Sequence, residues 1–273
     1  ATPPPKELKH TMKSIVITGS TRGIGYGLAD EFLKRGCAVT INGRSSASVD
    51  TALASLSRKH GDGRVAGQPG DVTRPETHQA LWDAAVAAFG RVDICVNNAG
   101  MGHPMLKIWE MPETMVDQGV DINLKGLLFG SQIAVRGMLA QGGGHLYNME
   151  GFGSNGRLRV GLSLYGATKS ALRFLSRSLT KETKGTPVKV STISPGIVIT
   201  ELLTDPFKDD PEGLERARWV FNALGDRVET VTPWLVDKML ANDKSGAAIE
   251  YLTTGKIITR FAAAPFRRRD LFS

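Results

Sequence analysis

The sequence has few of the features that mark disulfide-bonded, membrane-spanning or low-complexity proteins. It has two cysteines in 273 residues, and Cys37 and Cys95 stand in apolar stretches without metal-ligand spacing, so we expect reduced core residues and no metal site. No apolar run approaches the roughly 20 residues that a spanning helix needs. The beginning of the chain also lacks an apolar signal-peptide core. We therefore expect a cytoplasmic protein without stable membrane insertion.

The composition is that of an ordinary globular domain. Hydrophobic residues make up 41% and charged residues 22% of the chain, which favours neither disorder nor a membrane-spanning class. The net charge of +7 would suit nucleic acid, an acidic membrane surface or an anionic cofactor. Because most basic residues are scattered among acids, we expect no nucleic-acid partner.

Short apolar, β-branched runs alternate along the chain with stretches of helical periodicity. This alternation predicts an α/β fold of the Rossmann type, a doubly wound parallel sheet of about seven strands with helices on both faces, in a single domain. Ligands of such sheets bind beyond the carboxyl ends of the strands. The expected strands are 14–18, 37–41, 64–67, 93–96, 144–148, 189–193 and 247–252, and the expected helices lie near 23–35, 47–59, 75–89, 113–140, 163–183 and 229–242.

Three parts of the chain are distinguished by this pattern. Residues 1–12 are expected to form an N-terminal tail, residues 13–255 the Rossmann-fold domain, and residues 256–273 a basic C-terminal tail. Within the domain, residues 201–228 form a long excursion of the kind that often makes a lid. Its apolar side chains are expected either to cover a large apolar substrate or to pack on the protein's own core or a neighbouring subunit: Leu202, Leu203, Phe207, Trp219, Val220 and Phe221.

A glycine-rich turn follows the first expected strand in "TGSTRGIG", and such a turn lets backbone amides approach a pyrophosphate at a helix N-terminus. After the second strand, in "TINGRSS", Gly43 replaces the acid that would bind the ribose of NAD, and Arg44 follows. Arg22 is expected to reach the same place. Two guanidiniums without a carboxylate suit the 2′-phosphate of NADP, so we expect NADP(H) as the cofactor.

Two further strand ends are candidates for cofactor contacts. Asp71 in "GDVT" is expected either to accept a hydrogen bond from the adenine amino group or to act as a helix N-cap neighbour, and both interpretations stay open. The sequence "NNAG" at 97–100 places small polar residues where the cofactor's ribose would pass.

The motifs "TGSTRGIG", "NNAG", "YGATK" and "SPG", in this order over roughly residues 12–255, resemble the short-chain dehydrogenase/reductase family. The resemblance implies that Tyr165 is the general acid/base, and that Lys169 binds the nicotinamide ribose and lowers the pKa of the tyrosine. It also implies that Asn123 holds a water in the proton relay. The cofactor-binding residues predicted in all are Gly19, Ser20, Thr21, Arg22, Gly23, Ile24, Gly25, Arg44, Ser45, Asp71, Val72, Asn98, Ala99, Gly100, Tyr165, Lys169, Pro195, Gly196, Val198 and Thr200.

The sequence departs from the family at the end of the fifth strand, where the family usually has a serine that holds the substrate carbonyl. Glu150, Gly151 and Phe152 stand there instead. Ser154 on the same loop is expected to supply the hydroxyl, and Glu150 is the other residue that would replace it. An ionised Glu150 would repel a developing alkoxide, so it is expected to point away or to stay protonated through burial.

The segment "NMEGFGSNG" with "YGATKSALR" and "SPGIVITELL" resembles the chlorophyll b reductase branch of the family. This implies NADPH-dependent reduction of an aldehyde or ketone, with a bulky formyl-bearing, chlorophyll-like pigment as one substrate class, and a homodimer or homotetramer. The alternative is an NADP(H)-binding sensor or scaffold, but a non-catalytic site has no chemical need for Tyr165, Lys169 and Asn123. The basic tail is expected to be solvated, to cover an oligomer contact, or to touch an acidic membrane weakly.

Overall fold

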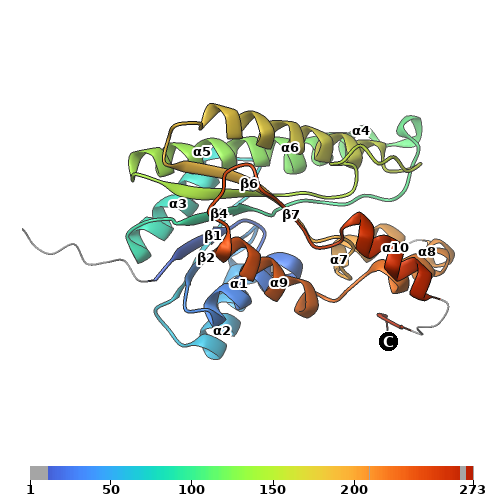
Figure 1. The fold of residues 1–273 in the computed structure, drawn as a ribbon, viewed down its shortest axis with the longest axis horizontal. Helices are drawn as coiled ribbons and strands as arrows, with labels where there is room; N and C mark the ends of the chain where they lie inside the picture. Colours follow the sequence, from blue (N-terminus) through green and yellow to red (C-terminus); the bar gives the residue numbers. More distant parts are fainter. Residues whose placement is uncertain (1–11, 209, 265–268, 273) are drawn as a thin grey trace, which may run out of the picture.

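Seven parallel strands form one sheet in the order β3-β2-β1-β4-β5-β6-β7 in the computed structural model, which describes residues 12–208, 210–264 and 269–272. Helices cover both faces of this sheet (Figure 1). The predicted Rossmann-type α/β fold is therefore confirmed. The strands are β1 (Ser14–Ile17), β2 (Ala38–Gly43), β3 (Val65–Pro69), β4 (Ile94–Asn97), β5 (Gly144–Met149), β6 (Val188–Ser194) and β7 (Ala248–Glu250).

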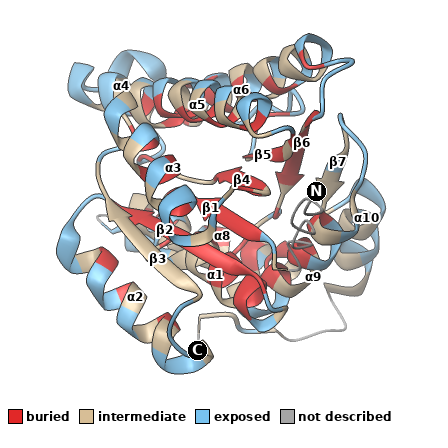
Figure 2. Cartoon of the chain, turned by 90° about the vertical axis from the view of Figure 1, so that its left-hand side faces the viewer, coloured by how far each residue is buried: buried red, intermediate tan, exposed pale blue. Residues whose placement is uncertain are grey.

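The central strands are buried because helices pack on both sides of them, as expected for a parallel sheet. Every residue of β1 and β2 is buried, and Figure 2 shows the sheet as a buried layer between two layers of helices. One layer holds α1 (Gly23–Lys34), α2 (Ser46–His60) and α9 (Val228–Ala241), and the other holds α3 (Pro75–Phe89), α4 (Glu113–Val120), α5 (Gly126–Ala140) and α6 (Ser163–Glu182).

The strand order reverses between β1 and β4, since the chain builds β1 to β3 toward one edge and then returns to build β4 to β7 toward the other. The turns that follow β1 and β4 therefore lie side by side at the carboxyl edge of the sheet, which is where ligands bind in folds of this type.

The helix expected at 113–140 is interrupted in the structure. A π-helical turn, Asp121–Lys125, separates α4 from α5 and contains Asn123. Single π turns inside α-helices are rare and frequently occur at functional sites. The hydrophobic periodicity predicted the long helix but carried no signal for this turn.

Residues 201–228 form α7 (Glu201–Thr204), a 3-10 turn (Asp205–Phe207) and α8 (Pro211–Leu224). Phe207 and Phe221 are buried and pack edge to face with ring centroids 6.0 Å apart. They form a small cluster of their own with neighbours that include Leu203. Leu202 and Trp219 stay exposed, so only part of the excursion's apolar surface is used by the protein itself.

The segment expected to be a basic tail begins as a helix, α10 (Thr254–Ala263), in which the Thr253 side chain accepts a hydrogen bond from Lys256 N. Arg260 and Arg269 both bind the buried carboxylate of Asp226, at 2.7 and 2.8 Å. Ion pairs thus hold Arg260 and Arg269 against the domain. Arg267 and Arg268, and residues 1–11 of the expected N-terminal tail, lie outside the described residues.

Cys37 and Cys95 are buried free thiols, and burial raises the pKa of Cys95 to about 12, which keeps it protonated. Within the described ranges we find no group of three or more His, Cys, Asp or Glu residues that could hold a metal ion. None of the helices in those ranges has the length and apolar character needed to cross a membrane.

Candidate active site

The glycine turn after β1 packs directly on the end of β4. Gly19 has φ of +61°, and a β-carbon there would lie 2.9 Å from Ala99 Cα. A β-carbon on Gly25 would lie 2.6 Å from Asn98 Nδ2, and this amide donates to the carbonyl oxygens of Thr18 and Gly19 at 2.9 and 3.0 Å. Because only glycine fits at these two positions, no side chain there covers the backbone amides of the turn.

Helix α1 begins at this turn without a side-chain cap, because Arg22 is its N-cap residue and makes no capping hydrogen bond. The first-turn amides are therefore available to an anion. Ser20 is used within the fold, since its hydroxyl donates to the main chain of β1 at 2.7 Å and accepts from Asn42 N at 2.9 Å. Arg22 forms an ion pair with Glu201 at the start of α7, so the structure joins it to the excursion and not to Arg44.

The end of β2 has no room for an acidic side chain. A β-carbon on Gly43 would lie 2.5 Å from Thr21 Cγ2 and 3.0 Å from Ser48 Oγ. The next residue, Arg44, is exposed, and Ser45 caps α2 by accepting from Ser48 N at 3.3 Å. The end of β2 thus has a basic side chain, that of Arg44, and no carboxylate.

Asp71 accepts a hydrogen bond from Thr73 N at 2.9 Å, which fits the N-cap-neighbour interpretation; the adenine contact stays a prediction. The following residue, Val72, is buried, and its carbonyl oxygen lies 2.8 Å from His78 Nε2. Both residues therefore have a role in shaping the turn before α3.

Gly100 brings the end of β4 next to two predicted catalytic residues. A β-carbon at this position would lie 3.2 Å from Asn123 Oδ1 and 3.7 Å from Lys169 Nζ. The Asn123 amide is bound on both sides by Met101, accepting from its N–H at 2.8 Å and donating to its carbonyl at 3.0 Å. In this structure the Asn123 side chain therefore holds the loop after β4 in place.

The loop after β6 closes the site from the other side. Gly196 has φ of +76°, in the left-handed region that favours glycine. Pro195 and Val198 are buried, and the Thr200 side chain would meet a β-carbon on Gly23 at 3.7 Å. The loop that the family resemblance assigns to the nicotinamide thus faces the glycine turn.

Tyr165 and Lys169 lie together on α6, as their spacing predicts. Lys169 Nζ is 5.6 Å from the centre of the Tyr165 ring and donates to Met149 O at 3.1 Å. Burial raises the pKa of Tyr165 to about 12 and lowers that of Lys169 to about 8, the latter opposed by the negative charge of Glu150. In the protein alone, burial thus outweighs the expected lowering of the tyrosine pKa by the lysine.

The residue that faces the Tyr165 hydroxyl is Gly151. A β-carbon there would overlap the hydroxyl and lie 3.1 Å from both Tyr165 Cζ and Lys169 Cε. Ser154, the expected replacement for the family's serine, is turned to the main chain, because its Oγ donates to Gly151 O at 2.8 Å and accepts from Gly151 N at 3.1 Å. A hydroxyl has one proton, and here it closes the 151–154 turn instead of facing a substrate.

Glu150 is buried behind this turn, with 5% of its surface exposed. Its Oε1 lies 3.5 Å from Arg173 Nε and has no hydrogen-bond partner in the described part of the chain. Arg173 also lies 3.7 Å from Glu250 at the surface. Burial raises the pKa of Glu150, and Arg173 and Lys169 oppose this, so a charge cluster runs from Lys169 to the surface.

His103 is a site residue that the sequence analysis missed. It is buried, and its Nε2 accepts from the backbone N–H of Tyr165 at 3.2 Å while its Nδ1 lies 2.7 Å from Pro104 O. This pairing requires the tautomer with the proton on Nδ1. The loop after β4 is thereby fixed to the first turn of α6. In the sequence, the position of His103 just after "NNAG" was the one feature that could have indicated a place in the site.

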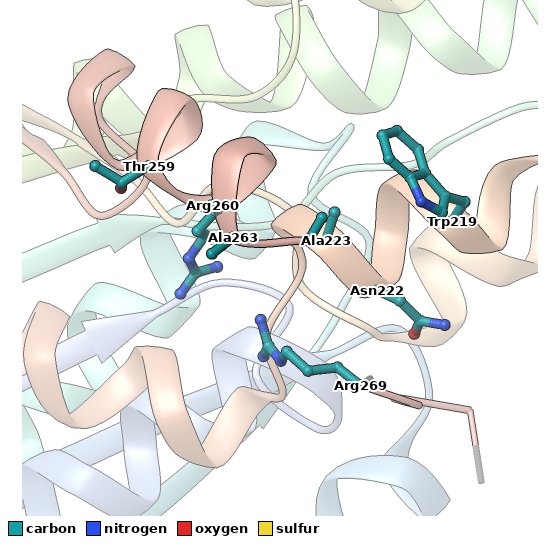
Figure 3. Close-up of a pocket in the computed structure, with 8 residues that line it drawn as sticks. Trp219, Asn222, Ala223, Thr259, Arg260, Ala263 and Arg269 are labelled. Atoms are coloured by element: carbon teal, nitrogen blue, oxygen red, sulfur yellow. The ribbon is translucent and has the colours of Figure 1, made fainter. Parts of the chain in front are cut away.

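A hollow of about 710 Å³ lies apart from these residues, between α8 and α10 (Figure 3). None of the predicted catalytic or cofactor-binding residues lines it. Its two arginines, Arg260 and Arg269, share one partner, the carboxylate of Asp226, which offsets one of their two positive charges. Its lining residues are Trp219, Asn222, Ala223, Thr259, Arg260, Ala263, Ala264 and Arg269.

Comparison with known proteins shows the family of the chain. A family model described as short chain dehydrogenase matches residues 13–211. A probable chlorophyll(ide) b reductase from the chloroplast of Arabidopsis thaliana is 35% identical over 276 residues, which cover 95% of this chain and 54% of that protein. A second chlorophyll(ide) b reductase of the same plant is 36% identical over 256 residues, covering 90% of this chain and 72% of the relative. The chain thus spans about half the length of the first relative.

Among solved structures, the chain is similar to L-sorbose reductase from Gluconobacter frateurii in complex with NADPH and L-sorbose. The TM-score is 0.75 at 26% sequence identity, and the match covers 88% of this chain and 94% of the other. These findings confirm the predicted resemblance, including that to the chlorophyll b reductase branch.

Proposed function

The chain belongs to the short-chain dehydrogenase family of oxidoreductases, and we propose that it uses NADPH to reduce the carbonyl group of a bulky apolar substrate to an alcohol. The observation that carries this proposal is the pair of the half-buried Tyr165 and the buried Lys169, which lies beside Gly100 at the carboxyl edge of the sheet. Burying a lysine without a full set of partners is unfavourable, and a sensor or scaffold that only binds the cofactor would have no chemical use for a tyrosine hydroxyl beside it.

The residues present fit a nicotinamide dinucleotide. The side-chain-free surface at Gly19 and Gly25, with the uncapped start of α1, would hold the pyrophosphate. Arg44 would bind the 2′-phosphate, because Gly43 leaves no room for a ribose-binding acid. Lys169 would hold the nicotinamide ribose. When bound, NADPH supplies the hydride for the carbonyl carbon.

The protein's own part in the reaction is to supply and move a proton. The Tyr165 hydroxyl would protonate the developing alkoxide. The charge of Lys169 then stabilises the phenolate left behind, and the Glu150 carboxylate favours the charged form of that lysine. Arg173 in turn favours the ionised form of Glu150. The cluster thus keeps a positive charge beside the tyrosine in a buried site.

The proposed substrate class is supported by the relatives. Chlorophyll(ide) b reductases are among the relatives at 34–36% identity, and a formyl group on a large planar ring is the carbonyl that such a name implies. We also propose that the protein is a homodimer or homotetramer, which light scattering would measure.

The test is turnover by purified protein with NADPH or NADH and a panel of carbonyl compounds that includes a formyl-bearing chlorophyllide and small aliphatic aldehydes. We expect NADPH consumption with the bulky aldehyde and none with the Tyr165→Phe variant. If the protein binds NADPH but reduces no member of the panel, the sensor or scaffold alternative is favoured instead.

A further inference from the structure

Two loops near the active site expose large apolar side chains to solvent. In the loop after β4, Trp109 is 77% exposed, and in the loop before α6, Leu158 and Val160 are 95% and 79% exposed. Exposed apolar side chains gathered in this way mark a binding surface more often than chance. We call residues 105–110 and 157–160 together the rim.

The two halves of the rim belong to one surface. A β-carbon on Gly161 would lie 2.8 Å from Met105 Cβ, and His103 accepts a hydrogen bond from Tyr165 N. The loops therefore touch directly above the first turn of α6, which carries the catalytic tyrosine. Figure 1 shows the segments before α4 and before α6 at the same end of the molecule.

Basic residues alternate with the apolar ones in the rim. Arg157 and Arg159 flank Leu158, are exposed, and make no ion pair with any residue that the structure describes. Lys107 is exposed and lies 5.5 Å over the Trp109 ring. The acid of the rim, Glu110, is 3.7 Å from Lys107, so the rim as a whole keeps a positive charge.

We propose that the rim docks this protein on a lipid bilayer that contains anionic headgroups. Leu158, Val160 and Trp109 would enter the boundary between headgroups and acyl chains, where aromatic side chains are favoured. Arg157 and Arg159 would bind the anionic headgroups. The docking itself does not depend on the proposed reaction, but it would turn the end of α6 that carries Tyr165 toward the bilayer, so that an apolar substrate could reach it without crossing water.

The basic residues argue against a second copy of the chain as the occupant. A two-fold contact brings the same surface of both copies together, so two surfaces of positive charge would face each other, which is unfavourable. The C-terminal segment is a weaker membrane candidate, because Arg260 and Arg269 are already paired with Asp226.

The test is co-sedimentation of the full chain with vesicles of phosphatidylcholine alone or mixed with phosphatidylglycerol. We expect binding to the anionic vesicles that weakens as salt is raised. The variant Leu158→Ser/Val160→Ser should bind them about tenfold more weakly, and Arg157→Gln/Arg159→Gln should lose the preference for phosphatidylglycerol. Two matched controls on other surfaces, Phe174→Ser on α6, whose side chain is 75% exposed, and Arg58→Gln on α2, should bind like the parent.

Turnover of a water-soluble aldehyde separates this proposal from the proposed reaction. Rim variants that bind vesicles weakly should keep the parent rate on that substrate, and an inactive parent that still binds vesicles through the rim would leave the docking in place. The proposal is overturned if the parent does not bind anionic vesicles, or if both rim variants bind as the parent does. A shift of the rim variants to a smaller oligomer, with vesicle binding unchanged, would assign the rim to a second copy or another protein.

Discussion

Gly151 faces the Tyr165 hydroxyl so closely that a β-carbon at position 151 would overlap it. The serine that the family usually has at the end of the fifth strand is therefore replaced here by a residue without a side chain. The position next to the Tyr165 hydroxyl holds no side chain, so no serine hydroxyl stands there. The site therefore has one hydrogen-bond donor fewer than its family resemblance implies.

Gly151→Ala adds a methyl group and no donor, and Gly151→Ser adds a hydroxyl, at a position where the Tyr165 hydroxyl leaves no room for a β-carbon. Overpacking a tight site costs about 1–3 kcal/mol, so both variants should lower kcat/KM for a bulky aldehyde by about tenfold or more. For a small aldehyde, Gly151→Ser should be faster than Gly151→Ala, because its hydroxyl can bind the carbonyl oxygen. Equal values for the parent and both variants on the bulky substrate would show that the close approach of Gly151 to the Tyr165 hydroxyl does not affect the reaction.

Ser154→Ala removes the side chain that closes the 151–154 turn. Because the Ser154 proton is donated to Gly151 O, we expect a loss of about 1 kcal/mol in the free energy of unfolding and a fall in kcat of less than about tenfold. A group that holds a developing oxyanion typically contributes about 10²–10³ in rate. A loss of that size with unchanged stability would return Ser154 to the role that the sequence suggested.

The fold was predictable because its determinants are local. The alternation of β-branched runs with helical periodicity gave all seven strands of the sheet, with bounds that differ from the structure by a few residues. The glycine turn and the pair Tyr165 and Lys169 were predictable for the same reason, since each depends on spacing within one short segment.

Other parts of the site depend on contacts between distant segments, which the sequence did not reveal. His103 binds the first turn of α6 across 62 residues of sequence. Arg22 is paired with Glu201, 179 residues away. No spacing rule connects such residues, so the partners could be identified only once the chain was folded.

Lys169 gives the reaction a pH dependence that Glu150 modifies. Because burial lowers the pKa of Lys169 to about 8, the lysine loses its charge as the pH rises through that value, and kcat should fall there. Glu150→Gln removes the negative charge that favours the protonated lysine, so the basic limb of the kcat profile should move to lower pH. An unchanged profile would mean that the buried carboxyl does not act on Lys169.

The proposed preference for NADPH over NADH depends on Arg44. Arg44→Asp removes a charge-assisted bond to the 2′-phosphate and should weaken NADPH binding by about tenfold or more, with little effect on NADH. Arg58→Asp, an exposed arginine on α2, is the matched control. Glu201→Gln should strengthen NADPH binding if Arg22 is then released toward the phosphate. Equal affinities of the parent for NADPH and NADH, measured by titration, would refute the arginine assignment.

The most direct test of the central claim is a single turnover with NADPH that carries deuterium at its transferable position and a formyl-bearing chlorophyllide, compared between the parent and Tyr165→Phe. We expect the parent to form an alcohol with the deuterium on the former carbonyl carbon. The variant should bind NADPH with the parent's affinity and form no alcohol, since only the transferable proton has been removed. An alcohol without deuterium in the parent, or alcohol formed at the parent's rate by the Phe variant, would contradict the account.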